Sequence, residues 1–306
     1  MAEVLCIGDS CADVIIPYGL AIKGEDVFAS FECGGSTANT ACALGKLGVS
    51  VSFIGRAGKD LYGLKMKEEL ERNGIDTSKM IIDENGVSTQ ILVIIDKNGE
   101  RLPFLMPKDN PSYLKIYPED LKIDADTKYI VTNGMMLFDN PSASSVCDFI
   151  ESSRNKGIKI ILDINYRIET RNKDPKYLNK VISMADVLLG SIEDDYLPYT
   201  HTDDIKKAIS HLKRDDLIIV ARNTCGSYVF NQDYEFYTPS YKVELTDTLG
   251  AGDAANAGFI YGLVNNLPLS ESNAYGCLMG AYCVNGKGAR HTPDIKELNN
   301  FKSKYE

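Results

Sequence analysis

The chain has 306 residues, of which 44% are hydrophobic and 25% are charged. These are ordinary values for a globular protein, and they exclude a disordered or fibrous chain. The 33 Lys and Arg residues against 43 Asp and Glu give a formal net charge of −10, which disfavours nucleic acid as a partner. No apolar run approaches the ~20 residues of a membrane helix, and the first residues lack a basic signal-peptide segment. We therefore expect a cytoplasmic protein with no membrane partner.

Short apolar runs alternate with helical patterns along the chain, which is typical of a mostly parallel sheet covered by helices. We expect core strands at Val4–Ile7, Val51–Ile54, Tyr129–Thr132, Ile158–Asp163, Val187–Leu189 and Leu217–Ala221. We expect helices at Thr37–Leu47, Leu61–Asn73, Ser142–Lys156, Asp203–Lys213, Asp253–Asn265 and Leu269–Val284, with a weaker one from Ile295. The alternation predicts an α/β fold.

Two stretches interrupt this alternation, residues 13–33 and 88–106. Both are rich in β-forming residues, and Lys97-Asn98-Gly99 predicts a hairpin turn in the second. No Pro- or Ser-rich linker separates them from the core elements, so we interpret them as an inserted β lid. The whole chain, residues 1–306, is then one domain, with apolar lid residues such as Ile15, Ile91 and Val93 exposed.

The cysteine and histidine residues give no sign of a metal site. None of the eight Cys residues forms a Cys-x-x-Cys pair, and several lie in apolar runs, as Cys6 does. The three His residues have no metal-ligand spacing. Buried, reduced thiols are therefore expected rather than disulfides or a zinc site.

The most specific stretch is Asp247-Thr248-Leu249-Gly250-Ala251-Gly252-Asp253, which precedes a predicted apolar helix. Its small residues would let backbone N–H groups converge on an anion, and the helix dipole would add positive potential. Asp253, held ionised by that potential, could accept a hydroxyl proton while the cradle stabilises a phosphoryl group. The alternative is a glycine-rich turn in which Asp253 only caps the helix.

A second glycine cluster, Gly34-Gly35-Ser36-Thr37-Ala38-Asn39, opens the helix that runs to Leu47. Paired glycines permit close approach of a ligand to the backbone, and the amide of Asn39 would lie in the same region. The chain has no Walker-A pattern and no Gly-x-Gly-x-x-Gly fingerprint. The missing fingerprint disfavours a nicotinamide-dependent dehydrogenase.

These two clusters, in this order and near the two ends of the chain, resemble those of the ribokinase-like carbohydrate kinases, the phosphofructokinase-B group. The resemblance spans essentially the whole chain and includes Gly8–Asp13 and Gly55–Gly63. It implies a three-layer α/β sandwich with a mostly parallel central sheet and a small β lid. It also implies transfer of the γ-phosphate of ATP to a small sugar, with Mg²⁺ and, in many members, K⁺. A homodimer through the lid would resemble several relatives.

Matching to the family motifs gives roles to individual residues. The resemblance makes Asp253 the catalytic base and the N–H groups of Gly250, Ala251 and Gly252 the anion hole. It places Asp247 and carbonyls of the Asn285–Thr292 loop at a monovalent-cation site. For Asp13 a strand-end turn, and for Arg167 a surface position, remain as alternatives. The sugar-binding residues implied in this way are Asp13, Gly34, Gly35, Asn39, Asn165, Arg167 and Asp253.

On the nucleotide side the family patterns are altered. The Asn-x-x-Glu motif appears as Gly190-Ser191-Ile192-Glu193, so Glu193 would hold Mg²⁺ through water while the Asn is missing. The Gly-x-x-Gly loop at the ATP site appears as Asn223-Thr224-Cys225-Gly226, and Asn tolerates the positive φ that such a turn uses. These departures leave open an unusual nucleotide preference or a weak activity.

The sequence does not name the sugar. Sugar-acid kinases of the family resemble this chain at Asp163–Arg167, but their lid segment ends in Tyr-Arg, whereas Phe104–Lys108 offers only Lys108. Arg167 could serve the transferred phosphate or a substrate carboxylate. We favour a fructose- or ribose-like sugar over a sugar acid such as 2-keto-3-deoxygluconate. A nucleoside kinase of the same family and a silent sugar- or nucleotide-binding protein remain as alternatives.

Overall fold

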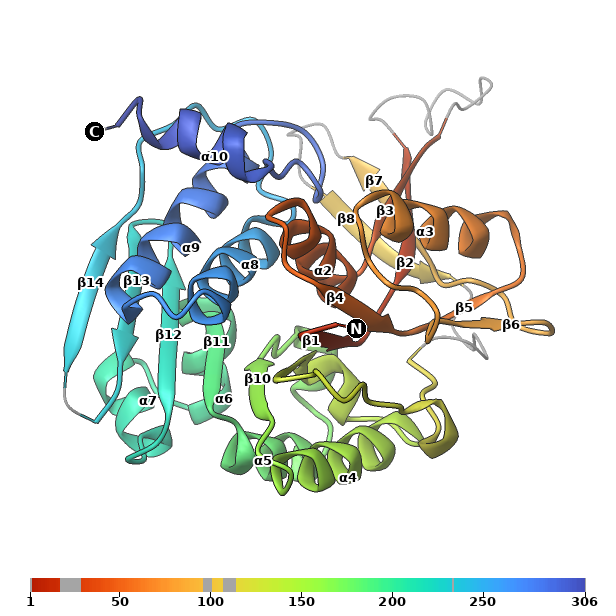
Figure 1. Cartoon of the computed structure of the whole chain (residues 1–306), viewed down its shortest axis with the longest axis horizontal. Helices are drawn as coiled ribbons and strands as arrows, with labels where there is room; N and C mark the ends of the chain where they lie inside the picture. Colours follow the sequence, from red (N-terminus) through yellow and green to blue (C-terminus); the bar gives the residue numbers. More distant parts are fainter. Residues whose placement is uncertain (1, 17–28, 96–100, 107–113, 233, 306) are drawn as a thin grey trace.

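The computed structural model describes residues 2–16, 29–95, 101–106, 114–232 and 234–305. Its central sheet has eight strands in the order β14-β13-β12-β11-β10-β9-β1-β4 (Figure 1). Six neighbouring strands are parallel and confirm the predicted core strands. They are β1 (Val4–Ile7), β4 (Val51–Ile54), β9 (Tyr129–Asn133), β10 (Lys159–Asp163), β11 (Val187–Ser191) and β12 (Ile218–Asn223).

Helices cover both faces of this sheet, so the predicted α/β sandwich is confirmed (Figure 1). One face carries α2 (Ser36–Lys46), α3 (Leu61–Arg72), α8 (Ala251–Val264), α9 (Leu269–Val284) and α10 (Ile295–Lys302). The other carries α4 (Ser142–Arg154), α5 (Lys176–Met184), α6 (Leu197–Thr200) and α7 (Ile205–Leu212). No helix of the described residues is long and apolar enough to cross a membrane.

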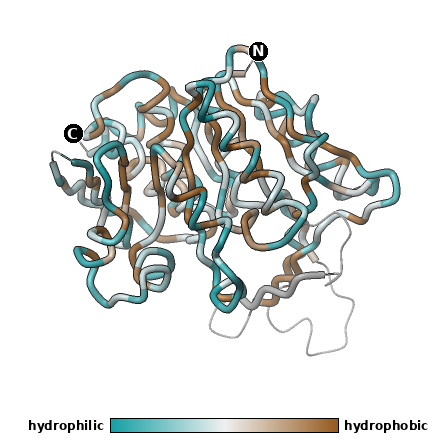
Figure 2. Tube along the Cα trace, turned by 90° about the horizontal axis from the view of Figure 1, so that it is seen from below, coloured by the Kyte–Doolittle hydropathy of each residue, from teal (hydrophilic) through white to brown (hydrophobic). Residues whose placement is uncertain are grey.

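The hydrophobic core consists of two clusters, one on each face of the sheet, because side chains alternate between the two faces of a strand. In β1, Val4 and Cys6 pack in the cluster under α2 and α8, whereas Leu5 and Ile7 pack in the cluster under α4 and α5. Strands buried on both faces appear in sequence as continuous apolar runs, as these do. Hydrophobic stretches accordingly pass through the interior of the trace, with hydrophilic ones mostly outside (Figure 2).

The sheet is extended at one edge by two antiparallel strands that the sequence analysis did not predict. They are β13 (Gly226–Phe230) and β14 (Glu235–Pro239). β14 alternates between exposed and half-buried residues, so it lacks the apolar run that identifies the central strands. The helix α5 was also missed.

The interrupted stretches form a separate four-stranded sheet in the order β3-β2-β7-β8. Its strands are β2 (Cys11–Ile16), β3 (Ser30–Gly34), β7 (Gln90–Ile95) and β8 (Arg101–Met106). β7 and β8 are antiparallel, but the predicted turn at 97–99 lies outside the described residues. The expected exposure of Val93 is wrong, because this residue of an inner strand pairs with Ile15 and is buried. Ile15 and Ile91 are half-buried.

Candidate active site

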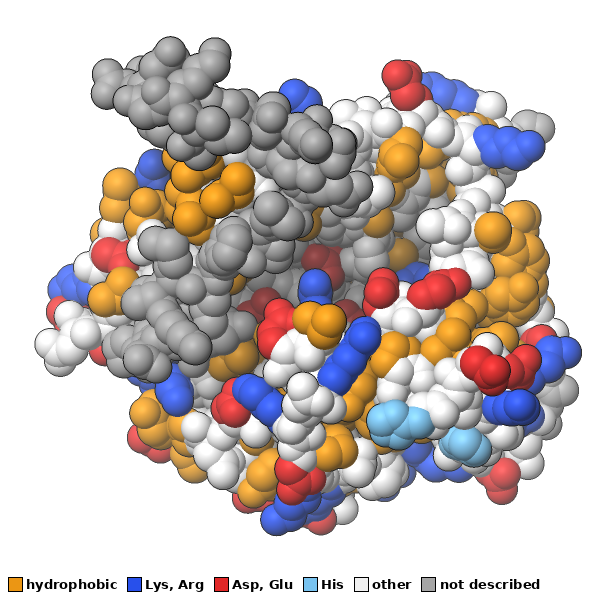
Figure 3. Space-filling model, turned by 180° about the vertical axis from the view of Figure 1, so that it is seen from behind, with side chains coloured by type: hydrophobic (Ala, Val, Ile, Leu, Met, Phe, Trp, Pro, Cys, Tyr) orange, Lys and Arg blue, Asp and Glu red, His pale blue; other side chains and the backbone are white. Residues whose placement is uncertain are grey.

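The carboxyl ends of the parallel strands meet at one edge of the sheet, where ligands bind in open α/β folds. β1 leads into Asp9, β9 ends at Asn133, β10 ends at Asp163 and β12 contains Arg222 just before its last residue. Viewed from behind, the molecule is hollowed near its centre, and acidic and basic side chains lie in the hollow (Figure 3). The strand ends thus bring charged and amide side chains together.

The first turn of α8 forms an open cradle of backbone N–H groups. Gly250 precedes the helix with φ 78°, and a Cβ on it would lie 2.3 Å from the carbonyl oxygen of Ala289. The N–H of Ala251 donates to Thr248 O at 3.3 Å, while those of Gly252 and Asp253 donate to no acceptor among the described residues. Free N–H groups at a helix start bind anions. The cradle therefore fits a phosphate group, and the share of Ala251 in the anion hole stays a prediction.

Asp253 is held between two donors from α2. Its Oδ1 accepts a hydrogen bond from Ser36 Oγ at 2.6 Å, and its Oδ2 accepts one from Asn39 Nδ2 at 2.9 Å. Desolvation raises the pKa of Asp253 to about 6, although both hydrogen bonds favour the ionised form and oppose the rise. Such a carboxylate is ionised at neutral pH and is still basic enough to take a hydroxyl proton.

The start of α2 is occupied by a carboxylate of the protein itself. Gly35 has φ 100°, and a Cβ there would lie 2.5 Å from the carbonyl oxygen of Asp9. The Asp9 carboxylate accepts hydrogen bonds from the N–H groups of Ser36 at 2.9 Å and Thr37 at 3.2 Å, and from Asn133 Nδ2 at 2.7 Å. Asp9 therefore fixes the helix that carries both donors to Asp253. The sequence analysis quoted Asp9 in Gly8–Asp13 but gave it no role.

A buried arginine sets the orientation of Asn39. Arg290 Nε donates to Asn39 Oδ1 at 3.0 Å, and Arg290 Nη2 donates to Gly34 O at 3.2 Å. Its Nη1 forms an ion pair with Glu69 of α3 at 2.9 Å. Because the Asn39 oxygen faces the guanidinium, its NH₂ group faces Asp253. The sequence analysis missed Arg290, which lies in the loop after α9.

The predicted sugar-binding residues gather at the same strand edge. Asp13 on β2 lies against Gly34, since a Cβ on Gly34 would be 2.6 Å from Asp13 Oδ2. Asn165 follows β10 with φ 40°, and its Oδ1 accepts a hydrogen bond from Arg167 Nε at 2.5 Å. Arg167 is exposed, as the surface alternative expects, and it lies in the field of Asp253 and Asp9. It forms no ion pair with a described carboxylate. It can therefore serve a ligand anion.

Two further carboxylates lie behind the cradle. Asp163 Oδ2 accepts a hydrogen bond from Asn256 Nδ2 at 3.1 Å. Asp195 accepts hydrogen bonds from the N–H groups of Tyr166 at 2.6 Å and Ser191 at 2.7 Å. Burial raises the pKa of both carboxyls, and the charge of Asp195 raises that of Asp163 further. Neither residue was singled out as a site residue from the sequence.

The nucleotide loop keeps its turn by a mechanism that differs from the prediction. Asn223 is not among the described residues with positive φ, so that expectation is wrong. Its Oδ1 instead accepts hydrogen bonds from the N–H groups of Cys225 at 2.9 Å and Gly226 at 3.1 Å, which closes the turn through the side chain. Gly226 takes the unusual conformation, with φ 156°.

The predicted magnesium ligand Glu193 lies on the turn that follows β11. Glu193 is exposed in the π-helical turn Ile192–Tyr196 after β11. No three His, Cys, Asp or Glu side chains of the described residues gather around a metal position. Magnesium bound with a nucleotide needs only one or two carboxylates, because phosphates and water supply the rest. An exposed carboxylate such as Glu193 fits that requirement.

Asp247 links the cradle to the Asn285–Thr292 loop. Its Oδ1 accepts from the N–H of Leu249 at 3.0 Å and its Oδ2 from the N–H of Gly288 at 3.0 Å. Two loop carbonyls, those of Arg290 and Thr292, already accept hydrogen bonds from Lys46 Nζ at 2.9 and 3.0 Å. A monovalent cation beside Asp247 would have to use other carbonyls of this loop.

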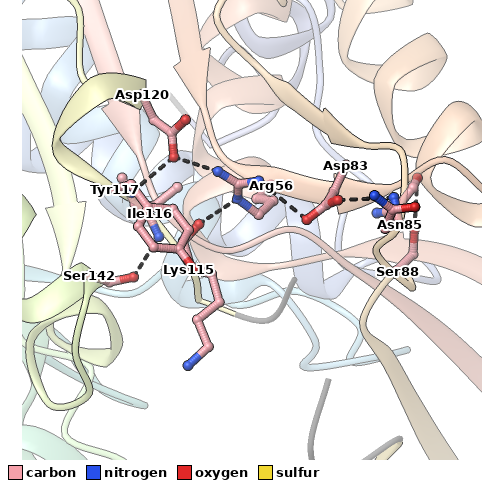
Figure 4. A network of polar contacts seen from close by, with 10 residues as sticks. Arg56, Asp83, Asn85, Ser88, Lys115, Ile116, Tyr117, Asp120 and Ser142 are labelled. Carbon is pink, nitrogen blue, oxygen red and sulfur yellow. Dashed lines mark hydrogen bonds and ion pairs between the residues drawn. The ribbon is translucent and has the colours of Figure 1, made fainter. Parts of the chain in front are cut away.

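The segment Gly55–Asp60 forms polar contacts with Ser88, which precedes β7, and with residues from Lys115 onward. On one side Arg56 of β5 (Arg56–Gly58) donates through Nε to Lys115 O at 2.7 Å and forms ion pairs with Asp120 at 2.6 Å and Asp83 at 3.3 Å (Figure 4). On the other side the Asp60 carboxylate accepts from Ser88 N at 2.8 Å and Ser88 Oγ at 2.6 Å. One short stretch of chain therefore contacts the residue Ser88 near the start of β7 and the chain that begins at Lys115.

A carboxylate that could accept a proton, at a helix start with free N–H groups, fits the site of a phosphotransferase that acts on a hydroxyl group. The chain matches the pfkB family of carbohydrate kinases over residues 1–296, and it belongs to that family. It is an enzyme that transfers the phosphoryl group of ATP to a sugar, and the alternative of a silent binding protein is not supported.

The chain is similar to a curated sugar-acid kinase in sequence and to two solved structures in fold. A 5-dehydro-2-deoxygluconokinase of Geobacillus thermodenitrificans is 29% identical, with 98% of this chain and 92% of the relative covered. A putative ribokinase II from E. coli in complex with ATP and Mg²⁺ has a similar fold, with a TM-score of 0.88, 20% identity and coverage of 99% and 100%. A fructokinase double mutant of Vibrio cholerae, with fructose, ADP and potassium bound, gives a TM-score of 0.84, 24% identity and 98% coverage of both chains.

Proposed function

We propose that this kinase phosphorylates the primary hydroxyl of a keto sugar acid of the 5-dehydro-2-deoxygluconate type. The observation that carries the proposal is the arrangement of Asp253 and Arg167. Asp253 accepts hydrogen bonds from Ser36 and Asn39. Arg167, which lies in its field, has no carboxylate partner among the described residues. The 29% identical relative bears the name of a kinase for this substrate. Such a substrate carries a carboxylate at one end and, at the other, a primary hydroxyl next to a ketone.

Asp253 takes the proton of the primary hydroxyl as its oxygen attacks the γ-phosphorus of ATP. The free N–H groups of Gly252 and Asp253 stabilise the charge on the phosphoryl group in flight. Ser36 and Asn39 hold the carboxylate in the position from which it can reach the hydroxyl. When Mg²⁺ is bound with ATP, it neutralises phosphate charge, and Glu193 would hold it through water.

The remaining roles follow from the same arrangement. Asp13, beside Gly34, accepts hydrogen bonds from sugar hydroxyls, and the Asn223–Gly226 loop flanks the nucleotide. Potassium bound near Asp247 would steady the loop that meets Gly250; a fructokinase of similar fold binds a potassium ion. The β3-β2-β7-β8 sheet is the lid of a single domain of residues 1–306, and it excludes water from the reaction. We also propose a homodimer through this lid, in the cytoplasm.

The proposal departs from the preference for a neutral ketose or pentose. That preference rested on the missing lid arginine, and Lys108, the other cation near that position, lies outside the described residues. The name of the relative favours the sugar-acid alternative. Fructose also has a primary hydroxyl next to a ketone. The preference for a ketose and the proposed keto sugar acid therefore agree on the group that reacts.

A sugar panel tests the proposal. ADP release would be measured with 5-dehydro-2-deoxygluconate, 2-keto-3-deoxygluconate, fructose, ribose and a ribonucleoside, each with ATP and Mg²⁺. We expect kcat/KM for 5-dehydro-2-deoxygluconate to exceed that for fructose by more than ~100-fold. Fructose, ribose or the nucleoside as the best substrate would overturn the substrate assignment.

The role of Arg167 is tested with the same panel. If Arg167 binds the substrate carboxylate, Arg167→Ala raises KM for the sugar acid and barely changes the kinetics of fructose. If it serves the phosphoryl group, kcat falls for every substrate alike. Arg154→Ala, an exposed arginine at the end of α4, is the matched control. An unchanged panel for Arg167→Ala would remove this residue from the site.

A further inference from the structure

We propose that Arg222 binds the β- and γ-phosphates of ATP, as a second guanidinium at the α8 cradle. Apart from the chain neighbours of Gly252 and the backbone of its own helix, the nearest described heavy atom to a Cβ built on Gly252 is Arg222 Nη2, at 3.9 Å. This guanidinium therefore faces the open side of the residue whose N–H is free. The inference rests on the ATP-dependent kinase function and does not depend on which sugar is used.

The charge of Arg222 is available to a ligand. Arg222 forms no ion pair with any carboxylate of the described part of the chain. Its side-chain hydrogen bond goes to the neutral amide of Asn256. Nη1 donates to Asn256 Oδ1. A half-buried guanidinium of this kind is incompletely compensated, because its donors outnumber its partners. An anion in the cradle would supply the missing acceptors.

Neighbouring residues hold Arg222 in place. Asn256 lies one turn after Asp253 on α8, and its Nδ2 donates to Asp163 Oδ2 at 3.1 Å. Asn256 thus receives a bond from Arg222 and passes one to Asp163, so the guanidinium is fixed without being neutralised by direct contact. Asp163 and Asp195 lie close enough for the charge of Arg222 to stabilise their ionised forms. A planar fork held in this way suits bidentate contact with phosphate oxygens.

A guanidinium group at the cradle would also offset the repulsion between the acidic strand ends and a nucleotide. The protein has a formal net charge of −10, and Asp9, Asp163, Asp195 and Asp253 all lie near the strand ends. A polyanionic nucleotide would be repelled from such an edge without local cations. Arg167 lies in the segment that follows β10, and Arg222 lies near the end of β12, so the two guanidinium groups come from two different strand ends. We assign Arg222 to the nucleotide because its strand leads directly into the Asn223–Gly226 loop.

Nucleotide binding without sugar tests the inference. Dissociation constants for AMP, ADP and a non-hydrolysable ATP analogue would be measured by calorimetry with Mg²⁺ for the intact chain, Arg222→Met, Arg222→Lys and Arg154→Met. We expect Arg222→Met to weaken the ATP analogue at least ~10-fold and AMP less than ~2-fold, with ADP between them. Arg222→Lys should recover part of the loss, since it keeps the charge but not the fork. The control Arg154→Met should bind all three normally.

The outcomes separate this inference from the kinase function. If the intact chain binds no nucleotide, the kinase function itself fails. If the intact chain binds ATP and Arg222→Met binds it equally well, or weakens AMP as much as the ATP analogue, the inference about Arg222 is wrong. A second readout is turnover of Arg222→Ala with added guanidinium ion. Partial recovery of kcat supports direct action of the guanidinium group, and no recovery at any guanidinium concentration that the intact enzyme tolerates counts against it.

Discussion

Replacing Asp253 with Asn separates the chemistry of the site from its architecture. Asn39 can donate only its NH₂ group to residue 253, because Arg290 occupies its Oδ1. The oxygen of the new amide must therefore face Asn39, and its NH₂ group then faces Ser36 Oγ, which can accept as well as donate. Asp253→Asn thus keeps both contacts with α2 and removes only the ability to accept a proton.

Two opposite effects follow from this substitution. Turnover should fall by ~10²–10⁴, the usual value of a general base, with KM for sugar and ATP nearly unchanged. Stability should rise at alkaline pH. Burial raises the pKa of Asp253 from 3.8 to about 6, so folding stabilises its protonated form, and that contribution is lost as the pH rises through 6. At ~1.4 kcal/mol per pKa unit, the ionised carboxylate costs the folded state up to about 3 kcal/mol at pH 8.

The assay combines ADP release with thermal unfolding over a range of pH. For the intact enzyme, kcat/KM should fall as the pH drops through about 6, and this acid limb should be absent from the residual activity of Asp253→Asn. The Tm of the variant should exceed that of the intact enzyme at pH 8, and the gap should shrink towards pH 4. Near-normal turnover of the variant would refute the assignment of the base. A lower Tm at pH 8 would refute the account of its burial.

Three further predictions concern the supports of the site. Ser36→Ala removes a hydrogen bond to the ionised base, so the acid limb of kcat/KM should move to higher pH by about one unit; an unmoved limb would contradict this. Gly250→Ala should lower the free energy of unfolding by more than ~1 kcal/mol in denaturant titrations, because of its positive φ and the contact with Ala289 O. Arg56→Met should lower the free energy of unfolding by about 3 kcal/mol, because it leaves the carboxylate of Asp120 without its ion-pair partner. Lys59→Met, which breaks an exposed ion pair, should lower it by less than ~1 kcal/mol. Equal losses for the two variants would contradict the argument from burial.

The core strands could be predicted because they are buried on both faces. A run such as Val4–Ile7 is apolar at every position, and nothing in its tertiary context contradicts that pattern. The edge strand Glu235–Pro239 alternates and carries polar residues, so a strand of this kind is visible only once its neighbour is known. The same reasoning applies to Val93, whose burial depends on its place inside the lid sheet and not on its own sequence.

The parts of the candidate site that are formed by the backbone could be predicted from the sequence. Gly250 and Gly35 have positive φ and carbonyl oxygens where a Cβ would stand, so glycine is required, and motifs built on glycine survive in the sequence. The side chains that orient the base were not predictable. Ser36 lies in a motif read for its glycines, and Arg290 lies in a loop 251 residues from its partner Asn39. Contacts of that separation leave no local pattern.

Departures from the family motifs had different consequences in the structure. Asn223 in place of Gly does not need the positive φ, because its side chain accepts the two N–H groups of the turn. The turn forms as predicted, but through the side chain of Asn223 and not through a positive φ at this residue. Gly190 in place of Asn is different, since a glycine has no side chain that could replace the lost amide.

The titrating groups explain why the site needs its ligands. Burial raises the pKa of Asp163, Asp195 and Asp253, so the ionised edge destabilises the folded chain near neutral pH. Arg167 and Arg222 offset part of that cost through the field, but neither pairs directly with a described carboxylate. Direct pairing with a carboxylate would neutralise the two cations that we propose for binding phosphate and substrate. In the roles proposed above, both guanidinium groups stay available to phosphate and substrate because neither forms an ion pair with a described carboxylate. The buried carboxylates that destabilise the folded chain lie at the same edge.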